Sequence, residues 1–138
     1  MKKVTRRSGC AISSALDIFG DKWSLLIIRD IVFFGKNTYN EFLKSDEKIS
    51  TNILADRLSM LENEGILKKE EHPASKSKIF YKISEKGIEL LPLLIETILW
   101  SEKFLPLSEA SALLAAKLRS NRKGILKELQ YKLRQPLS

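Results

Sequence analysis

Apolar residues recur at helical spacing between Ser50 and Gly65, and small polar residues occupy the opposite side of the same stretch. Leu54, Leu58 and Leu61 form a stripe of the kind that packs into a core. Ser50 can cap the first turn by accepting a hydrogen bond from an orphan backbone N–H. Gly65 can adopt the left-handed conformation that ends many helices. The pattern therefore predicts one helix over 50–65, with a small polar outer face.

Two more helices are predicted ahead of this one. The first covers 10–19 and ends at Gly20, while the second covers 22–34 and follows the capping residue Asp21. The second is apolar nearly all round, which is typical of a helix in the centre of a core or between subunits. The first should turn four apolar side chains inward: Ile12, Ala15, Leu16 and Phe19.

A short helix and a hairpin are predicted on either side of the 50–65 helix. Thr38 and Glu41 have the spacing of a capping box, so a short helix should begin there. The segments 66–71 and 78–83 suit strands, and the HPASKS stretch between them is turn-forming. Two helices joined by a brief polar loop and followed by a hairpin make a winged helix-turn-helix. The predicted fold class is therefore α+β, mostly α.

The rest of the chain is predicted to be helical in two parts. Ser84 caps a long helix over 85–104, in which Pro92 predicts a local kink. Pro106 separates this helix from a tail that Ser108 caps and that carries leucines at helical spacing. The expected domains are a winged-helix DNA-binding domain at 1–106 and a basic helical extension at 107–138.

The positive charge is concentrated at the two ends of the chain. The 138 residues carry a net charge of +7. Residues 1–16 contribute +4, and residues 117–138 contribute 7 − 1 = +6, so the middle carries 7 − 10 = −3. Basic arms commonly contact polyanions, although simple solubility explains them equally well. A nucleic-acid surface in the middle of the chain must therefore be a local patch.

Composition argues against several classes of protein. No apolar run reaches the ~18 residues that a membrane span needs, and no secretory signal is visible. A single cysteine cannot form an internal disulfide, which fits a reducing cytoplasm. One histidine and one cysteine far apart give no metal-ligand spacing, and no catalytic constellation is present. We therefore expect a cytoplasmic protein with no metal, no cofactor, no membrane contact and no enzymatic activity.

Four blocks of sequence follow one another in a distinctive order. They are CAISSALDIFGDKWSLLIIRDI, TYNEFL, ISTNILADRLSMLENEGIL and YKISEKGIELLP, and Trp100 follows them. In this order they resemble the HxlR-type family of bacterial winged-helix transcriptional regulators. The resemblance implies a homodimer on near-palindromic double-stranded DNA, with added N- and C-terminal helices building the dimer. It also implies that some members sense electrophiles through a cysteine near the N-terminus.

The resemblance favours a sequence-specific DNA-binding transcriptional regulator, acting as a dimeric repressor or dual regulator that responds to redox state or electrophiles. A second class stays open, because the acidic middle of the chain also suits a winged-helix module that binds proteins and not DNA. No particular small-molecule effector is indicated.

The candidate DNA-binding residues lie on three predicted elements. The outer face of the 50–65 helix is expected to read base edges in the major groove. Lys76 and Lys78 in the hairpin are candidates for phosphate contact, as are Lys36 and Tyr39 where the short helix begins. Asp56 can accept from a cytosine amino group or pair with a nearby cation. The candidates on the 50–65 helix are Ser50, Thr51, Asn52, Ala55, Asp56 and Ser59.

Cys10 lies where the first predicted helix begins, beside Arg6 and Arg7. A helix N-terminus and neighbouring cations lower the pKa of a thiol and raise its reactivity. Burial as a small apolar residue is an equally common role for cysteine. Cys10 is therefore a candidate redox sensor, with packing as the alternative. Trp23 and Trp100 are expected to pack rather than to bind a ligand.

Overall fold

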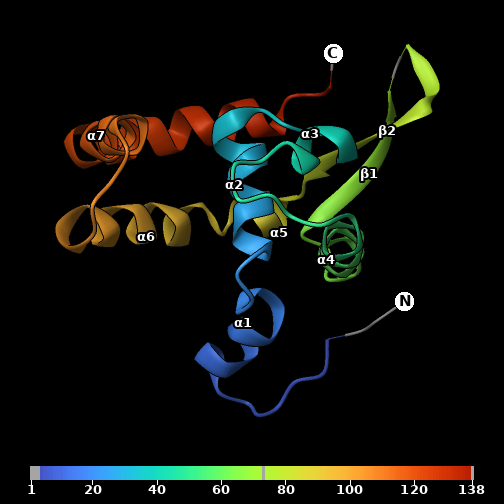
Figure 1. Ribbon diagram of the computed structural model, residues 1–138, viewed down its shortest axis with the longest axis horizontal. Helices are drawn as coiled ribbons and strands as arrows, with labels where there is room; N and C mark the ends of the chain where they lie inside the picture. Colours follow the sequence, from blue (N-terminus) through green and yellow to red (C-terminus); the bar gives the residue numbers. More distant parts are fainter. Residues whose placement is uncertain (1–3, 73, 138) are drawn as a thin grey trace. The chain divides into compact units, whose positions relative to one another are not determined.

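The chain forms two compact units (Figure 1). The computed structural model describes residues 4–72 and 74–137, without the side chain of Lys76. The first unit runs to Gly87 and includes Pro136 and Leu137, and the second is Ile88–Gln135. The first unit contains α1 (Ala11–Phe19), α2 (Ser24–Phe34), α3 (Tyr39–Leu43), α4 (Thr51–Asn63), β1 (Leu67–His72) and β2 (Ser75–Ile83). The division of the chain falls within α5 (Glu85–Ile88), after Gly87, and the second unit contains α6 (Leu91–Phe104) and α7 (Glu109–Arg134).

Helix α2 occupies the centre of the first unit, as its apolar composition predicts. Ile27, Ile28 and Ile31 are buried, and the helix contacts α1, α4 and β2. The carboxylate of Asp21 accepts from the backbone N–H groups of Trp23 and Ser24 at 2.9 and 3.0 Å, which satisfies two orphan donors where α2 begins. The other elements of the unit are therefore placed against a well-anchored central helix.

The ends of α3 and α4 follow the predicted capping chemistry. The Thr38 hydroxyl accepts from the Glu41 backbone N–H at 3.2 Å, while the Glu41 carboxylate accepts from the Thr38 N–H at 3.1 Å, which completes a capping box. The Ser50 hydroxyl accepts from the Ile53 N–H at 3.3 Å. Gly65 has φ of 74°, a conformation that costs an L-residue roughly 1–2 kcal/mol and that glycine adopts freely.

The hairpin packs on the helix-turn-helix through β2. Strands β1 and β2 are antiparallel, with Leu67 opposite Ile83 and Lys69 opposite Tyr81. The Tyr81 backbone N–H donates to the Asn37 carbonyl at 2.7 Å. The rings of Tyr81 and Phe42 pack edge to face, with their centroids 6.1 Å apart. Figure 1 shows the hairpin extending beyond α3 and α4 as a wing. The α+β winged helix-turn-helix prediction is confirmed.

Strand β2 is longer than predicted, β1 keeps its predicted length but begins and ends one residue later, and the turn between them is shorter. The ladder reaches His72 on β1 and resumes at Ser75 on β2, with a register shift between Glu71 and His72. The serine and lysine residues placed in the turn therefore continue β2, because their alternation is compatible with a strand. Pro73, the proline of the HPASKS stretch, lies outside the described residues.

The helix predicted over 85–104 is two helices. Helix α5 ends at Ile88, and α6 begins at Leu91 with Pro92 in its first turn. A proline in the first turn loses no hydrogen bond, because the first N–H groups of a helix have no partner within it. The expected kink inside one helix is therefore wrong, and Pro92 instead helps to start α6. The caps expected at Ser84 and Ser108 are present, since their hydroxyls accept from the N–H groups of Gly87 and Ser111.

Within the second unit, α6 and α7 pack against each other. Arg119 and Arg122 of α7 form ion pairs with Glu102 and Glu96 of α6. Ala115 and Leu118 are fully buried. Helix α7 contains a break at Asn121, whose φ of −148° and ψ of 55° are not helical. None of the helices in the described part of the chain is both long and apolar enough to span a bilayer.

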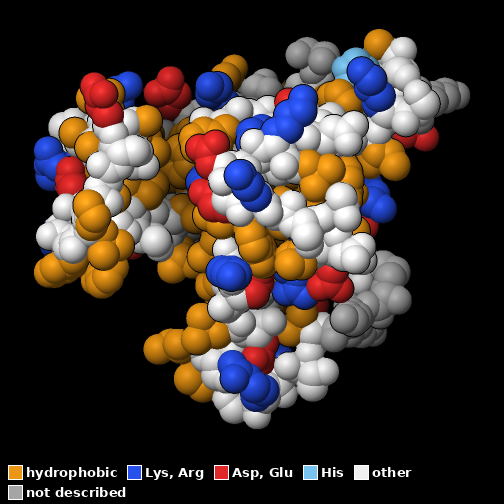
Figure 2. Space-filling view, in the orientation of Figure 1, with side chains coloured by type: hydrophobic (Ala, Val, Ile, Leu, Met, Phe, Trp, Pro, Cys, Tyr) orange, Lys and Arg blue, Asp and Glu red, His pale blue; other side chains and the backbone are white. Residues whose placement is uncertain are grey.

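Several apolar side chains predicted to pack are exposed in the single chain. Ile12 and Leu16 of α1 are 72% and 48% exposed, and no residue of α1 is buried. Trp100 and Phe104 of α6 are 58% and 67% exposed, with their ring centroids 5.4 Å apart. Figure 2 shows apolar side chains on the surface of α1 and at the end of the α6–α7 pair. Within one chain, the expectation that α1 turns its apolar face inward is therefore wrong for Ile12 and Leu16, whereas Ala15 and Phe19 are half-buried. Trp100 packs on Phe104 but stays largely exposed.

Candidate nucleic-acid interface

Helix α4 separates a buried apolar stripe from an exposed polar face. Leu54, Leu58 and Leu61 are at most 2% exposed, and burying a leucine side chain stabilises a fold by roughly 1.5–3 kcal/mol. The helix contacts α2, α3 and β1 through this side. The outer face carries short side chains that offer hydroxyl and amide groups to solvent. Its exposed members are Ser50, Thr51, Asn52, Ala55 and Ser59.

Asp56 is engaged in an ion pair at the edge of this face. Its carboxylate accepts from Arg57 at 2.5 and 3.1 Å, and Arg57 also lies 3.4 Å from the carboxylate of Asp21. Burial opposes the charge on Arg57, but the two carboxylates outweigh it and raise its pKa above the ordinary value. Arg57 therefore ties α4 to the start of α2. Of the two roles considered for Asp56, the structure contains the pairing with a cation, and base contact stays a prediction.

Tyr39 supports the beginning of α4. Its hydroxyl donates to the backbone carbonyl of Thr51 at 3.0 Å. This contact joins the first residue of α3 to the first turn of the helix that carries the polar face. The sequence suggested only a phosphate contact for Tyr39, and that contact stays a prediction. No periodicity or motif in the sequence indicates a hydrogen bond between these two residues.

Lys36 belongs to a charged cluster beside α2. Asp30 is 2% exposed and accepts from Arg29 at 3.0 and 2.7 Å, while Arg29 also donates to Glu47 at 2.7 and 2.8 Å. The Lys36 ammonium lies 3.8 Å from Asp30 and 5.9 Å from the ring centroid of Phe34. Hydrogen bonds from Arg29 lower the pKa of Glu47, with burial acting in the opposite direction. The cluster fixes the loop that precedes α4.

The wing carries cations on one face of its strands. Lys78, Phe80 and Lys82 alternate along β2, so they point to the same side. Lys82 pairs in register with Lys68 of β1, which places two cations opposite each other, and Glu70, opposite Phe80, lies on the same face. Lys68 and Lys78 are exposed. Lys68 and Lys82 were not candidates from the sequence, because only the strand register brings them together.

Cys10 is exposed at the N-terminal end of α1. Backbone N–H groups of Ser13 and Ile12 lower the pKa of its thiol by stabilising the thiolate. The neighbouring Arg7 pairs with Asp17 at 2.5 Å, and Arg6 donates to Ser14 at 3.1 Å. In the described part of the chain, no group of three or more His, Cys, Asp and Glu residues is placed to hold a metal ion.

The fold and the exposed face of α4 define a winged helix-turn-helix transcriptional regulator that binds DNA. Residues 18–109 match the HxlR-like helix-turn-helix family, and the chain belongs to this family. The resemblance of the sequence to HxlR-type regulators is therefore confirmed.

Relatives of known name agree with this assignment. The uncharacterized HTH-type transcriptional regulator YdeP of Bacillus subtilis is 32% identical over 96 residues, which cover 70% of this chain and 74% of YdeP. The HTH-type transcriptional regulator YodB of the same organism is 30% identical over 93 residues, which cover 67% of this chain and 82% of YodB. Structures of YodB exist in reduced, diamide-treated and quinone-bound forms.

A solved structure extends the comparison to the fold. The redox regulator HypR in its oxidized form superposes with a TM-score of 0.62 at 27% identity, covering 71% of this chain and all of HypR. The similarity supports the winged-helix assignment of the described chain.

Proposed function

We propose that the protein binds a near-palindromic operator as a homodimer and places α4 of each subunit in the major groove. The observation that carries this proposal is the exposed face of Thr51, Asn52, Ala55 and Ser59 on a helix whose other side is buried. Short side chains let a helix approach base edges closely, and the Asn52 amide can make a bidentate contact with adenine. Ser50 lies at the helix N-terminus, where backbone N–H groups favour phosphate.

In this proposal the wing and α3 hold the DNA backbone. Lys68, Lys78 and Lys82 share a face of the wing that also carries Glu70, and we assign the three lysines to phosphate contact. Lys76 belongs to the same strand, and its phosphate contact remains an expectation from the sequence. Lys36 and Tyr39 lie at the entry to α3 and are assigned to backbone contact on the same basis. Phosphate contacts of this kind set the register of a protein on DNA without selecting sequence.

The dimer is proposed from apolar surface that a single chain leaves exposed. Ile12 and Leu16 on α1, and Trp100 and Phe104 on α6, are each about half exposed or more. Large apolar side chains that gather on a surface usually mark an interface. We assign α1 and α6 to dimerisation, residues 1–106 to the DNA-binding domain and 107–138 to an extension. We propose no enzymatic activity, and we place the protein in the cytoplasm, where its DNA would be.

Cys10 is proposed as a redox-sensitive residue. Its thiol is exposed, the first turn of α1 stabilises its thiolate, and α1 belongs to the proposed dimer interface. With one cysteine in each chain, a disulfide formed within the dimer can only join the two subunits, and the other disulfide product is a mixed adduct with a small thiol. Either product would alter α1 and so change the spacing between the α4 helices of the two subunits. The alternative is that Cys10 has no part in regulation.

A gel-shift titration with Asn52→Ala and Lys78→Ala tests the proposal. An operator is first selected from random duplexes with the wild-type protein. Asn52→Ala should lose roughly 1–3 kcal/mol of binding to the operator and little binding to scrambled DNA. Lys78→Ala should weaken both about equally and reduce the salt slope by about one unit. Light scattering should show a dimer at micromolar concentration.

Two results would contradict this proposal. If the two variants behave alike, the assignment of α4 to the groove and the wing to the backbone is wrong. If the wild-type protein binds no duplex at all, the alternative of a protein-interaction module is favoured. Comparison of wild type with Cys10→Ser under diamide separates a sensor from an inert thiol, since equal operator affinity after complete thiol oxidation would remove the sensor role.

A further inference from the structure

Most of α7 lies beyond the part of the chain that matches the family, which ends at residue 109. The helix carries seven Lys and Arg residues against Glu109 and Glu128, a net charge of 7 − 2 = +5. None of these seven cations belongs to the winged helix. The contacts of each cation show which of them serve the fold and which do not.

The arginines and the lysines of α7 differ in their contacts. Arg119 and Arg122 pair with Glu102 and Glu96 and so hold α7 to α6. Within the described chain, none of the four lysines of α7 forms an ion pair, and all four are exposed. They are Lys117, Lys123, Lys127 and Lys132. Their charge is therefore available to an outside partner.

The break at Asn121 makes the second half of α7 a helix with its own start. The Asn121 side chain accepts from the Gly124 N–H at 3.3 Å, as an N-cap does. A Cβ on Gly124 would lie 2.5 Å from Asn121 Nδ2, so a side chain at this position would displace the Asn121 amide from its present place. The segment from Arg122 to Arg134 consequently has a fixed helical register. This register decides which side chains share a face.

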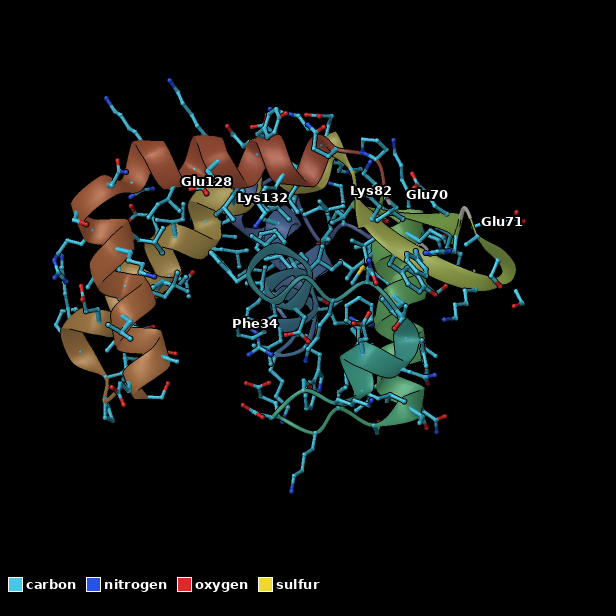
Figure 3. The ribbon with its side chains drawn as sticks, turned by 90° about the horizontal axis from the view of Figure 1, so that it is seen from above. Phe34, Glu70, Glu71, Lys82, Glu128 and Lys132 are labelled. Atoms are coloured by element: carbon cyan, nitrogen blue, oxygen red, sulfur yellow. The ribbon has the colours of Figure 1, made fainter. Side chains whose placement is uncertain are left out.

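Two lysines and a tyrosine align on one face of this segment. Lys123, Lys127 and Tyr131 are spaced four residues apart, and Tyr131 is 68% exposed. We call the face formed by Lys123, Lys127 and Tyr131 the basic stripe. Glu128 follows Lys127 directly and is therefore turned about 100° from it around the helix axis. Figure 3 shows Glu128 and Lys132 on α7. Within the described segment 122–134, Glu128 is the acidic residue, and it borders the stripe beside Tyr131.

We propose that the basic stripe is a second DNA-binding surface, which contacts phosphates and does not read sequence. Residues four apart on a helix are separated by about 6 Å along its axis, and each DNA strand presents a phosphate about every 3.4 Å of duplex axis. Neighbouring lysines can therefore engage separate phosphates. Lysine ammonium and tyrosine hydroxyl groups are ordinary phosphate partners. This inference rests on the proposed function, because it assumes that the protein acts on duplex DNA.

The test compares two full-length variants that lose the same charge. Lys123→Gln/Lys127→Gln removes both lysines of the basic stripe, and Lys103→Gln/Lys117→Gln removes two exposed lysines of the same unit outside it. Binding of each to the selected operator and to a scrambled duplex is measured by fluorescence anisotropy between 50 and 200 mM salt. Circular dichroism and light scattering confirm an unchanged fold and oligomeric state.

The stripe variant should lose affinity for both duplexes by the same factor. Two phosphate contacts per subunit correspond to a salt slope smaller by about 1.8 for each subunit engaged, and to a loss of roughly 10- to 60-fold for each subunit engaged at 0.1 M salt. The control variant should change by less than about threefold, because screening weakens distant charges. The ratio of operator to scrambled affinity should stay constant.

Four outcomes would overturn the inference. An unchanged affinity and salt slope in the stripe variant would assign the basic stripe to another partner, such as an acidic protein. An equal loss in the control would show an effect of net charge alone. If Asn52→Ala loses operator preference while the stripe variant binds normally, the inference fails and the proposed function stands. If the wild-type protein binds neither duplex, both fail.

Discussion

Replacement of Arg29 by methionine should strongly destabilise the first unit. Arg29 donates two hydrogen bonds to Asp30, at 3.0 and 2.7 Å, and two to Glu47. Asp30 is 2% exposed, so the substitution leaves a carboxylate buried beside Lys36 alone, at 3.8 Å. Removing one partner of a buried ion pair costs about 3–5 kcal/mol. Because Lys36 offsets part of this, we expect a loss of roughly 3 kcal/mol.

Urea unfolding of Arg29→Met, Asp30→Asn and the double variant measures this loss. A Trp100→Phe background leaves Trp23 as the single tryptophan, so its fluorescence reports the first unit. Asp30→Asn removes the charge that Arg29 compensates, so the double variant should recover about 2 kcal/mol relative to the sum of the single losses. Protein concentration is held constant, since dimerisation would shift apparent stability.

The charged cluster of Arg29, Asp30 and Glu47 also predicts that the stability of the first unit depends on pH. The pKa of Glu47 is lowered in the folded state by Arg29. The ionised Glu47 carboxylate therefore contributes its full stabilisation above the unfolded pKa of about 4.3. This stabilisation is lost as the pH falls through the lower pKa of the folded state. The difference between wild type and Arg29→Met should shrink in acid. A loss below about 1 kcal/mol at pH 7, or strict additivity of the two substitutions, would refute the reasoning.

Three further predictions concern α4, its support and the thiol. Gly65→Ala should lower the free energy of unfolding by about 1 kcal/mol, because φ at this position is 74°. The new Cβ itself would cause no clash, since its nearest neighbour lies 3.9 Å away. Urea unfolding measures the loss, and an unchanged stability would show that the turn relaxes. Tyr39→Phe should weaken operator binding several-fold more than binding to scrambled DNA, because the bond to Thr51 orients α4; an equal loss on both duplexes would favour a phosphate contact. Alkylation of Cys10 by iodoacetamide, followed against pH, should show a midpoint below that of the same cysteine in urea, since the pKa of the thiol is lowered in the fold; identical midpoints would contradict this.

Local rules predicted most elements of the fold. The caps at Thr38, Ser50 and Ser108 form the hydrogen bonds that their spacing indicated, because capping involves residues within one turn of helix. Pro92 was placed inside a helix because apolar residues continue at helical spacing and α6 begins without a side-chain cap at Leu90. The break at Asn121 was missed for a related reason, since the leucines keep helical spacing across it.

The candidate site was predictable only in part. The exposed face of α4 follows from its periodicity, and the structure does expose Thr51, Asn52, Ala55 and Ser59. The pairing of Lys68 with Lys82 depends on strand register, and the bond from Tyr39 to Thr51 depends on how two helices meet. Neither can be obtained from spacing along one element. The apolar face of α1 was expected to be buried because hydrophobicity alone does not distinguish a core from a subunit interface.

The arrangement of α4 has a consequence for how such regulators diversify. Its buried leucines and the contacts from Arg57 and Tyr39 fix the backbone of the helix. The side chains at 51, 52, 55 and 59 are exposed and form no side-chain hydrogen bond or ion pair with the described residues. Substitutions at these four positions should therefore change which operator is bound at little cost in stability. Descendants of one ancestral gene could acquire new target promoters by drift at four codons, without passing through unfolded intermediates.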